Sequence, residues 1–172
     1  HFMGSRPMIR FTNVSKSFPG VKALDGISFE IAKGEIRAIV GENGAGKSTL
    51  LNILHGVYPA NEGTVEIDGR QVNFHSAQEA IQYGVAKVHQ EVSLISELTV
   101  GQNITLGYEP RNGLFIDYPK MHEQANAILD RLHCKFRSED SVKDLSVGEM
   151  QMISVAKALF HNAKVISLDE PT

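Results

Sequence analysis

The sequence GENGAGKS, residues 41–48, follows the pattern G-x-x-x-x-G-K-[ST] and stands between an apolar run and a segment with helical spacing. Glycines in such a loop let backbone N–H groups close around a phosphate, because no Cβ atoms stand in the way. The helix that follows adds unpaired N–H groups and the positive end of its dipole. The stretch predicts a phosphate-binding loop, although alone it does not separate kinases, GTPases and transport ATPases.

Chemistry suggests a role for each polar side chain of this loop. Lys47 is expected to contact the β- and γ-phosphates of a nucleotide, and the hydroxyl of Ser48 to bind Mg²⁺. A glycine-rich turn that binds nothing is the alternative, which the matching lysine and serine disfavour. The predicted nucleotide-binding residues of the loop are Gly41, Glu42, Asn43, Gly44, Ala45, Gly46, Lys47, Ser48 and Thr49.

Two adjacent carboxylates, Asp169 and Glu170, follow the apolar run Val165–Leu168 near the end of the sequence. Paired with a phosphate loop, Asp169 is expected to hold the shell of Mg²⁺, through water, and Glu170 to polarise an attacking water as general base. A solvated strand end is the alternative. Ser167 departs from the apolar pattern of the predicted strand, and we expect it either to bond to backbone or to mark a less buried face.

The stretch LSVGEMQ, residues 145–151, predicts a second helix N-terminus. Ser146 and Glu149 fit the S-x-x-E capping box, and apolar residues follow at helical spacing. Gly148 allows close approach of another backbone, so this helix end could receive a phosphate. Taken alone, the stretch is more typical of an ordinary capped helix than of a phosphate site.

With these motifs in this order, residues Met8 to Thr172 resemble the ATP-binding-cassette (ABC) ATPases. LSVGEMQ is similar to their signature, with Val147 where the commonest form has glycine, and Val88-His89-Gln90-Glu91 is similar to their glutamine loop. Phe18 stands where the family has an aromatic residue that stacks on adenine, although a core position is an alternative for it. The resemblance implies three sets of site residues: catalytic Glu170, Gln90 and Lys47; metal-binding Ser48, Gln90 and Asp169; and signature residues Ser146, Val147, Gly148 and Glu149.

The resemblance also implies cofactors and partners. In this family two domains face each other head to tail, and each ATP, with Mg²⁺, lies between the phosphate loop of one and the signature of the other. Membrane permease subunits, and indirectly a solute-binding protein, are the further partners, with the ATPase at the cytoplasmic face of the inner membrane. A net charge of −3 gives no indication of nucleic-acid binding.

A finer match narrows the expected function. The stretches VHQEVSLISELTVGQNITLGYEP and LSVGEMQMISVAKAL resemble the first half of the tandem ATPases of bacterial ribose-, xylose- and galactose-type importers. The expected function is therefore the ATP-hydrolysing motor of a monosaccharide importer. An ATPase for a nucleoside or related solute, or a soluble ABC ATPase without a transport role, are alternatives. A GTPase is disfavoured because the Asn-Lys-x-Asp motif for guanine is absent.

Hydrophobic patterning predicts an α/β fold with a mainly parallel sheet. Within it, the resemblance implies a P-loop NTPase (RecA-like) core, an antiparallel β subdomain and a helical subdomain. The expected division is a vector remnant at 1–7, a core with its β subdomain at 8–91, the helical subdomain at 92–145, and the signature helix and acidic strand at 146–172. The expected strands are 9–14, 27–31, 36–40, 64–67, 72–74, 85–89 and 165–168, and the expected helices are 47–55, 77–83, 100–106, 121–132 and 146–160.

Composition sets further limits. A chain of 172 residues suits one domain, the lone Cys134 cannot form an internal disulfide, and no apolar run reaches the roughly 18 residues of a membrane span. The resemblance implies more chain after Thr172, including a strand that leads to a histidine near the γ-phosphate. We therefore expect a C-terminally truncated domain, in which 36–40 and 165–168 would have unpaired edges. Three outcomes are open: more residues follow those given, the fragment pairs with a strand of another chain, or the two strands close the gap directly and distort the site. A chain that ends at Thr172 is expected to bind ATP weakly or not at all and to hydrolyse it negligibly.

Overall fold

The computed structural model describes residues 7–40, 46–89 and 93–169 of the chain. These residues form two compact units, which meet in the sequence between Tyr83 and Gly84. The division of residues 8–172 at 91 and 145, expected from the sequence, stays a prediction.

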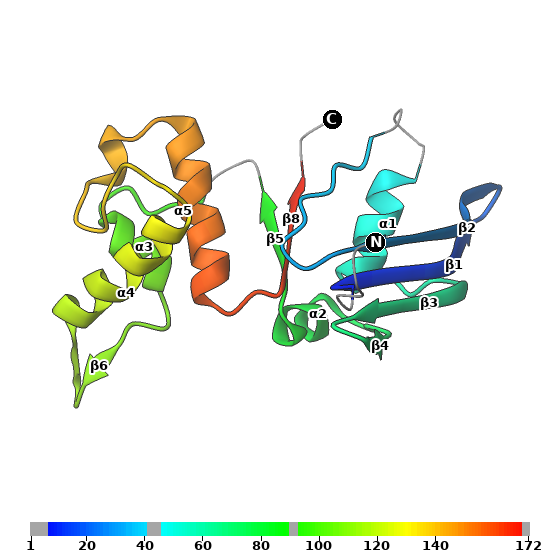
Figure 1. The fold of residues 1–172 in the computed structure, drawn as a ribbon, viewed down its shortest axis with the longest axis horizontal. Coiled ribbons are helices and arrows are strands. Elements are labelled where there is room, and N and C mark those ends of the chain that lie inside the picture. Colours follow the sequence, from blue (N-terminus) through cyan, green and yellow to red (C-terminus); the bar gives the residue numbers. More distant parts are fainter. Residues whose placement is uncertain (1–6, 41–45, 90–92, 170–172) are drawn as a thin grey trace, which may run out of the picture. The chain divides into compact units, whose positions relative to one another are not determined.

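The first unit is built on a four-stranded antiparallel sheet in the order β2-β1-β3-β4 (Figure 1). Its core is apolar: one face of β1 and β3 is buried together with one face of α1, and Phe11 stacks on Phe29 with ring centroids 4.7 Å apart. The elements of this unit are β1 Ile9–Phe18, β2 Val21–Ile31, α1 Lys47–Leu54, β3 Glu62–Ile67, β4 Arg70–Val72 and α2 Ala77–Tyr83.

The strands expected at 64–67 and 72–74 are found as β3 and β4, Glu62–Ile67 and Arg70–Val72, which form a hairpin. Ile67 pairs with Arg70, so Asp68 and Gly69 are the two turn residues, and both have positive φ, 51° and 69°. Two positive φ angles define the type I′ turn, whose twist matches that of the flanking strands.

The predicted buried strand at 36–40 is wrong. Within the described residues this segment forms no strand, and Ile36 and Val40 are 97% and 91% exposed. The physical reason lies in the pairing: the two parallel strands of the described residues pair with each other, and no third strand of the described residues supplies the ladder hydrogen bonds that a buried strand needs. The expectation of a mainly parallel sheet is also wrong for the described residues of the chain, because the largest sheet that they form, with four strands, is antiparallel.

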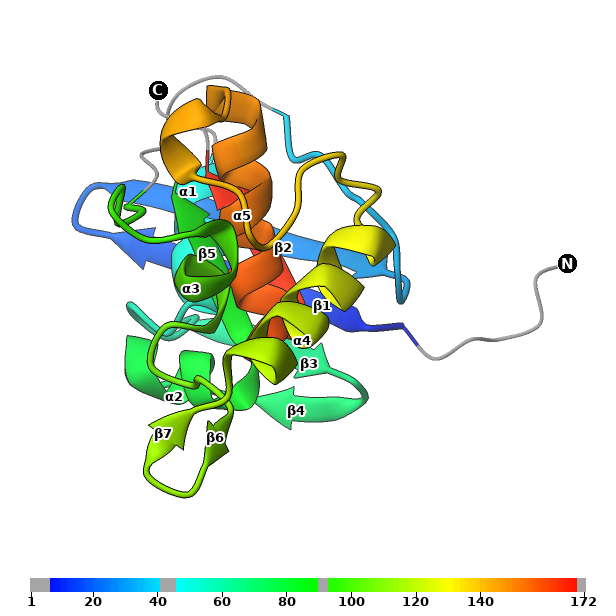
Figure 2. The ribbon, with the colours of Figure 1, turned by 90° about the vertical axis from the view of Figure 1, so that its left-hand side faces the viewer.

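The second unit combines a two-stranded parallel sheet with helices. β5 pairs with β8 along their whole length, from Val85 opposite Val165 to His89 opposite Asp169. The helices α3, α4 and α5 pack against one another (Figure 2). The elements of this unit are β5 Val85–His89, α3 Val100–Thr105, β6 Arg111–Asn112, β7 Phe115–Ile116, α4 Tyr118–Arg131, α5 Val147–Phe160 and β8 Val165–Asp169, with a 3₁₀ turn at Val142–Asp144.

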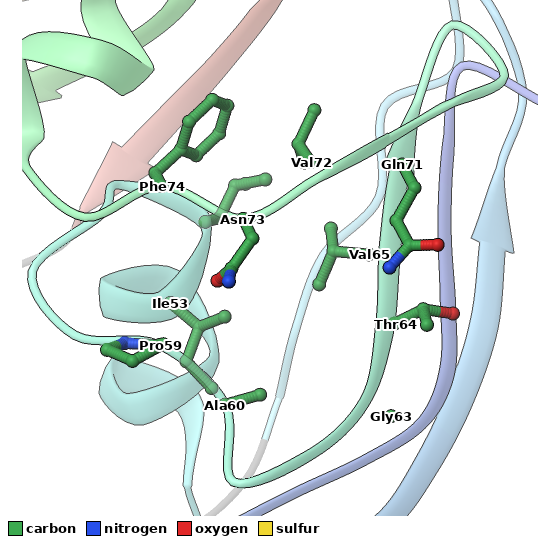
Figure 3. Close-up of a pocket in the computed structure, with 11 residues that line it drawn as sticks. Ile53, Pro59, Ala60, Gly63, Thr64, Val65, Gln71, Val72, Asn73 and Phe74 are labelled. Atoms are coloured by element: carbon green, nitrogen blue, oxygen red, sulfur yellow. The ribbon is translucent and has the colours of Figure 1, made fainter.

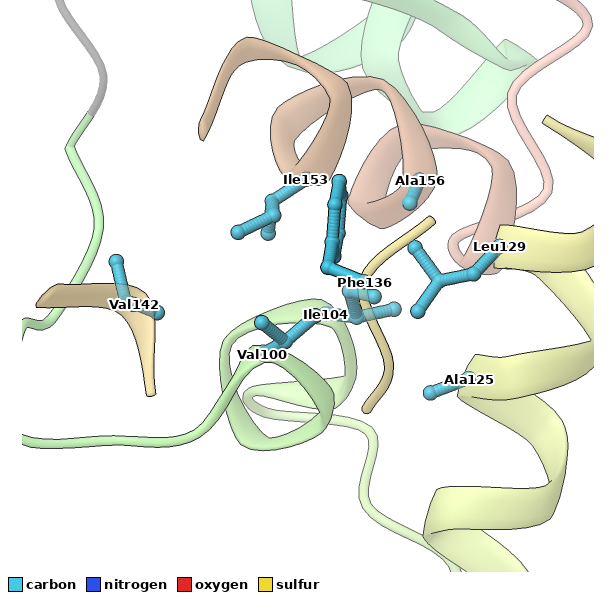
Figure 4. Packing of buried hydrophobic residues seen from close by; sticks show 8 residues of the cluster. All are labelled: Val100, Ile104, Ala125, Leu129, Phe136, Val142, Ile153 and Ala156. Atoms are coloured by element: carbon cyan, nitrogen blue, oxygen red, sulfur yellow. The ribbon is translucent and has the colours of Figure 1, made fainter. Parts of the chain in front are cut away.

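Buried side chains from all three helices and the segment between α4 and α5 form the core of this unit (Figure 4). Fully buried Ile104, Leu129 and Ile153 come from α3, α4 and α5 in turn. The remaining members of the cluster are Val100, Ala125, Phe136, Val142 and Ala156. The helical character predicted for residues 92–145 is thus confirmed, because apolar spacing along each helix meets a common core.

The segment 107–119, for which the sequence predicts neither a helix nor a strand, contains the small hairpin β6–β7. Asn112 pairs with Phe115, which leaves Gly113 and Leu114 as the turn, and Gly113 has φ of 63°. Glycine at the first of two turn positions is typical of a type II′ turn. The glycine was therefore a usable hairpin signal in the sequence.

Gly101 on α3 should not tolerate a side chain. A Cβ built there would lie 2.2 Å from Oγ of Ser138, which is itself fully buried. Gly101→Ala is therefore expected to destabilise the protein by about 1–3 kcal/mol, as overpacking does. Thermal unfolding measures the loss, and Gly148→Ala on α5 is the matched control, because a Cβ there meets no described atom within 4 Å. Equal stability of the two variants would contradict the packing argument.

Candidate functional site

The end of the predicted phosphate loop requires glycine at residue 46. Gly46 is the N-cap of α1 with φ of 90°, and an added Cβ would lie 2.4 Å from the carbonyl oxygen of Ala23 and 2.8 Å from Cδ2 of Leu24. Both neighbours belong to β2. Glycine therefore serves two needs here: a left-handed backbone and the close approach of the loop to a strand.

The first turn of α1 presents the predicted phosphate-binding residues. Lys47, Ser48 and Thr49 open the helix, and the turn contains no acidic residue. A glycine N-cap has no side chain to occupy the first N–H groups, so the positive end of this helix is suited to an anion. Ser48 is exposed, and Lys47 and Thr49 are partly exposed. The predicted residues Gly41, Glu42, Asn43, Gly44 and Ala45 lie outside the described residues.

Phe18 is the last residue of β1 and is 39% exposed. Its ring meets the ring of Tyr58 edge to face, with centroids 5.3 Å apart. This exposure contradicts the core position considered from the sequence, and the stacking role of Phe18 stays a prediction.

The pairing of β5 with β8 bears on the predicted glutamine loop and the predicted acidic strand, because these motifs lie at the carboxyl ends of the two strands. His89 pairs with Asp169, so β5 and β8 end at the same edge of their sheet. Carboxyl ends of parallel strands are where ligands bind in α/β sheets. Gln90, Glu170 and the side chain of Asp169 lie outside the described residues, so their positions stay predictions. Ser167 is buried, which rules out the less buried face considered for it.

The signature helix α5 begins as predicted, with a complete capping box. Oγ of Ser146 accepts from the backbone N–H of Glu149 at 3.3 Å, and Oε2 of Glu149 accepts from the backbone N–H of Ser146 at 2.8 Å. The same carboxylate oxygen accepts from the Ser146 hydroxyl at 2.7 Å. Val147 is 69% exposed, and a Cβ at Gly148 would meet no described atom within 4 Å. Val147 and Gly148 are therefore accessible within their own unit.

This capping box makes α5 sensitive to acid. The backbone N–H and the hydroxyl of Ser146 both bond to the Glu149 carboxylate and lower its pKa. A lowered pKa contributes stability above the ordinary glutamate pKa of about 4.3, and this contribution disappears as the pH falls through the folded-state value.

Two variants test the cap. Ser146→Ala is expected to cost about 1 kcal/mol at neutral pH, since it removes an N-cap. Glu149→Gln keeps an acceptor but no charge, so its stability deficit should be present at pH 7 and vanish near pH 3. Thermal unfolding at both pH values measures this, and a deficit that grows toward pH 3 would contradict the assignment.

A pocket of about 120 Å³ lies at the opposite end of α1 from the phosphate-binding turn (Figure 3). Ile53 and Leu54, at the C-terminal end of the helix, line it together with Val65 and Phe74. The residues that line it include no lysine, arginine or histidine to bind a phosphate. We assign it no part in the nucleotide site.

Sequence analysis missed two features of the structure. Thr99 and Gln102 form a second capping box at α3, and the T-x-x-Q spacing was a usable signal for it. The contact of Tyr58 with Phe18 was not foreseen, and no sequence spacing indicates a contact between residues 40 positions apart.

Gly46 and the helix it opens place the chain in the class of phosphate-loop nucleotide-binding proteins. The sequence model described as ABC transporter matches residues 24–172, and the chain belongs to this family.

Individual relatives agree with this family. The galactose/methyl galactoside import ATP-binding protein MglA of Yersinia pestis bv. Antiqua (strain Antiqua) is 45% identical over 165 residues, which are 96% of this chain and 33% of that protein. The chain thus spans about a third of the length of the curated relatives it matches.

Solved structures agree on the fold. The cbiO1 protein of Clostridium perfringens, part of the ABC transporter complex cbiONQ, superimposes with a TM-score of 0.77 at 25% identity, covering 98% of this chain and 67% of that chain. A dimeric ATP-binding cassette in a post-hydrolysis state with ADP and Pi gives a TM-score of 0.65 at 27% identity, covering 96% and 75%. An α/β ABC ATPase fold with an antiparallel sheet and a helical part is therefore established for this chain.

Among the residues that the structure describes, no helix has the length and apolar character needed to cross a membrane.

Proposed function

We propose that this chain is the nucleotide-binding part of an ATPase that powers a bacterial ABC importer for a monosaccharide. The observation that carries the proposal is the start of α1: a glycine N-cap that closely approaches β2, followed by Lys47 and Ser48 in a turn without acids. Such a helix end is suited to the phosphates of ATP. The assignment of a monosaccharide rests on the similarity to the galactose/methyl galactoside import protein of Yersinia pestis.

Mg²⁺ fits the donors proposed for it. The hydroxyl of Ser48 is exposed on the first turn of α1, and Asp169 ends β8. Hydroxyl and carboxylate oxygens, with phosphate oxygens of the nucleotide, are the ligands Mg²⁺ prefers. Ser48, Gln90 and Asp169 would hold the ion, which would neutralise charge on the phosphates.

The chemistry we propose is attack of water on the γ-phosphate. Lys47 binds the β- and γ-phosphates, Glu170 accepts a proton from the attacking water, and Gln90 helps to position that water. The parallel register of β5 and β8 supports this assignment, because both strands end at the same sheet edge, one residue before Gln90 and Glu170 in the sequence.

We propose a second ATPase domain as the direct partner. The solved cassette dimer supports this arrangement, as do the exposed Val147 and the open surface at Gly148. Ser146, Val147, Gly148 and Glu149 would then meet the nucleotide of the partner domain. The further partners are permease subunits and, through them, a solute-binding protein, with the ATPase peripheral at the cytoplasmic face of the inner membrane.

Reconstitution tests the importer. A protein that contains this chain at its relatives' length, assembled in vesicles with the permease encoded beside it, should hydrolyse ATP faster when a loaded monosaccharide-binding protein is present. If ATP turnover is seen but no monosaccharide-loaded binding protein stimulates it, the assignment of a sugar substrate is overturned. If no ATP turnover is seen, the proposal that the protein is an ATPase is overturned.

A further inference from the structure

We propose that Tyr58 is a positioning residue that orients the Phe18 ring for stacking on the nucleobase of the bound nucleotide. This inference rests on the proposed function and deepens it, because it assigns a residue to the base end of the same site. Tyr58 lies in the segment between α1 and β3, outside the phosphate loop, the signature and the acidic strand.

The ring contact is the first observation. Phe18 is the last residue of its strand and is 39% exposed, so its own strand does little to restrict the orientation of its ring. Tyr58 meets it at 5.3 Å between centroids and 82° between planes. An edge-to-face contact of this kind is favourable and holds the two rings at a defined angle to each other. It therefore restricts the orientation of the Phe18 ring, which remains 39% exposed.

The Tyr58 segment is in turn fastened to β1. Nζ of Lys16 donates to the carbonyl oxygen of Pro59 at 2.7 Å and lies 5.0 Å from the Tyr58 ring centroid and 5.6 Å from that of Phe18. Asn61 makes hydrogen bonds to the two neighbours of Lys16. Its side-chain Oδ1 accepts from the backbone N–H of Ser17 at 2.7 Å, and its backbone N–H donates to the carbonyl oxygen of Ser15 at 2.9 Å. The segment that carries Tyr58 is held against the strand that carries Phe18.

A further bond joins this arrangement to the phosphate helix. Nδ2 of Asn52, on α1, lies 3.2 Å from the hydroxyl of Tyr58. The backbone N–H of Val57 donates to the carbonyl of Asn52 at 2.9 Å. The helix whose first turn presents Lys47 thus also supports the residue that orients Phe18, so the phosphate end and the base end of the site share one scaffold.

This arrangement gives distinct expectations for ATP and for inorganic triphosphate, which has no base. Tyr58→Leu removes the ring contact, and we expect it to weaken ATP binding about two- to tenfold, the range of an aromatic pair, while triphosphate binding stays unchanged. Tyr58→Phe keeps the ring and should restore ATP affinity to within about twofold. Phe18→Ala should weaken ATP binding about five- to 150-fold, and adding Tyr58→Leu to it should change nothing further.

The experiment is a ³¹P NMR titration of the chain with ATP and with triphosphate, because this method detects the weak binding expected of these 172 residues. Tyr83→Leu is the matched control, because Tyr83 pairs with Phe74 in the same unit, away from Phe18. ATP affinity unchanged in Tyr58→Leu, or equal losses for ATP and triphosphate, would overturn the positioning role. If Phe18→Ala also leaves ATP binding unchanged, the base site of the proposed function has failed instead.

A second measurement needs no nucleotide. The chain contains no tryptophan, so Phe18→Trp introduces a single tryptophan at the stacking position, whose fluorescence can be excited selectively over that of the tyrosines. Adding Tyr58→Leu should lower the fluorescence anisotropy of this reporter and raise its quenching by acrylamide, whereas adding Tyr83→Leu should change neither. An anisotropy that Tyr58→Leu leaves unchanged would show that Tyr58 does not orient residue 18.

Discussion

Glu170→Gln is expected to reduce ATP turnover about 10²-fold or more while ATP binding is retained. The amide cannot accept a proton from the attacking water, yet it has nearly the shape of the carboxylate and removes no phosphate contact. The measurement is phosphate release, with nucleotide binding determined in parallel, in a protein that extends this chain to the length of its curated relatives.

Glu123→Gln is the control for this variant. It makes the same chemical change at an exposed position on α4 and should leave turnover intact. Normal turnover in Glu170→Gln would overturn the assignment of the general base. Loss of binding together with turnover would indicate a structural role instead.

Gly46→Ala is expected to abolish detectable nucleotide binding and to destabilise the first unit. The methyl group would lie 2.4 Å from the carbonyl oxygen of Ala23, so either the loop or β2 must shift. A left-handed backbone adds a cost of about 1–2 kcal/mol for any residue with a Cβ, beyond about 1–3 kcal/mol for overpacking. Displacing the loop also moves the first turn of α1 and with it Lys47.

Gly34→Ala separates the two causes. Gly34 has φ of 78°, similar to that of Gly46, but a Cβ there meets no described atom within 4 Å. It should show the backbone cost alone, with nucleotide binding preserved. Chemical denaturation and ATP titration of both variants check this, and equal effects of the two substitutions would contradict the importance of the close approach to β2.

Local signals predicted much of this fold. The Asp68-Gly69 turn needs two positive φ angles, which few residue pairs adopt, and the Ser146/Glu149 box satisfies backbone groups within four residues. Such features depend on neighbours in the sequence, so the sequence contains what decides them. The same holds for the site: glycine spacing and one lysine were sufficient to place the start of α1.

Features that depend on distant partners could not be predicted in this way. The segment 36–40 has the composition of a buried strand, but a strand also needs a neighbour to supply its hydrogen bonds, and within the described residues it has none. The Phe18–Tyr58 contact depends on how the segment after α1 folds back on β1, and hydrophobic periodicity contains no information about that return.

The most direct test of the central claim, that ATP binds with its phosphates at the first turn of α1, is ³¹P NMR of Mg·ATP with this chain. The method detects weak binding, which is what we expect of these 172 residues. The γ-phosphate signal should broaden and shift with the wild-type chain, and Lys47→Ala should reduce this effect about tenfold or more, as loss of a charge-assisted hydrogen bond does. A γ-phosphate signal that does not respond to the wild-type chain, or responds equally to Lys47→Ala, would contradict the account.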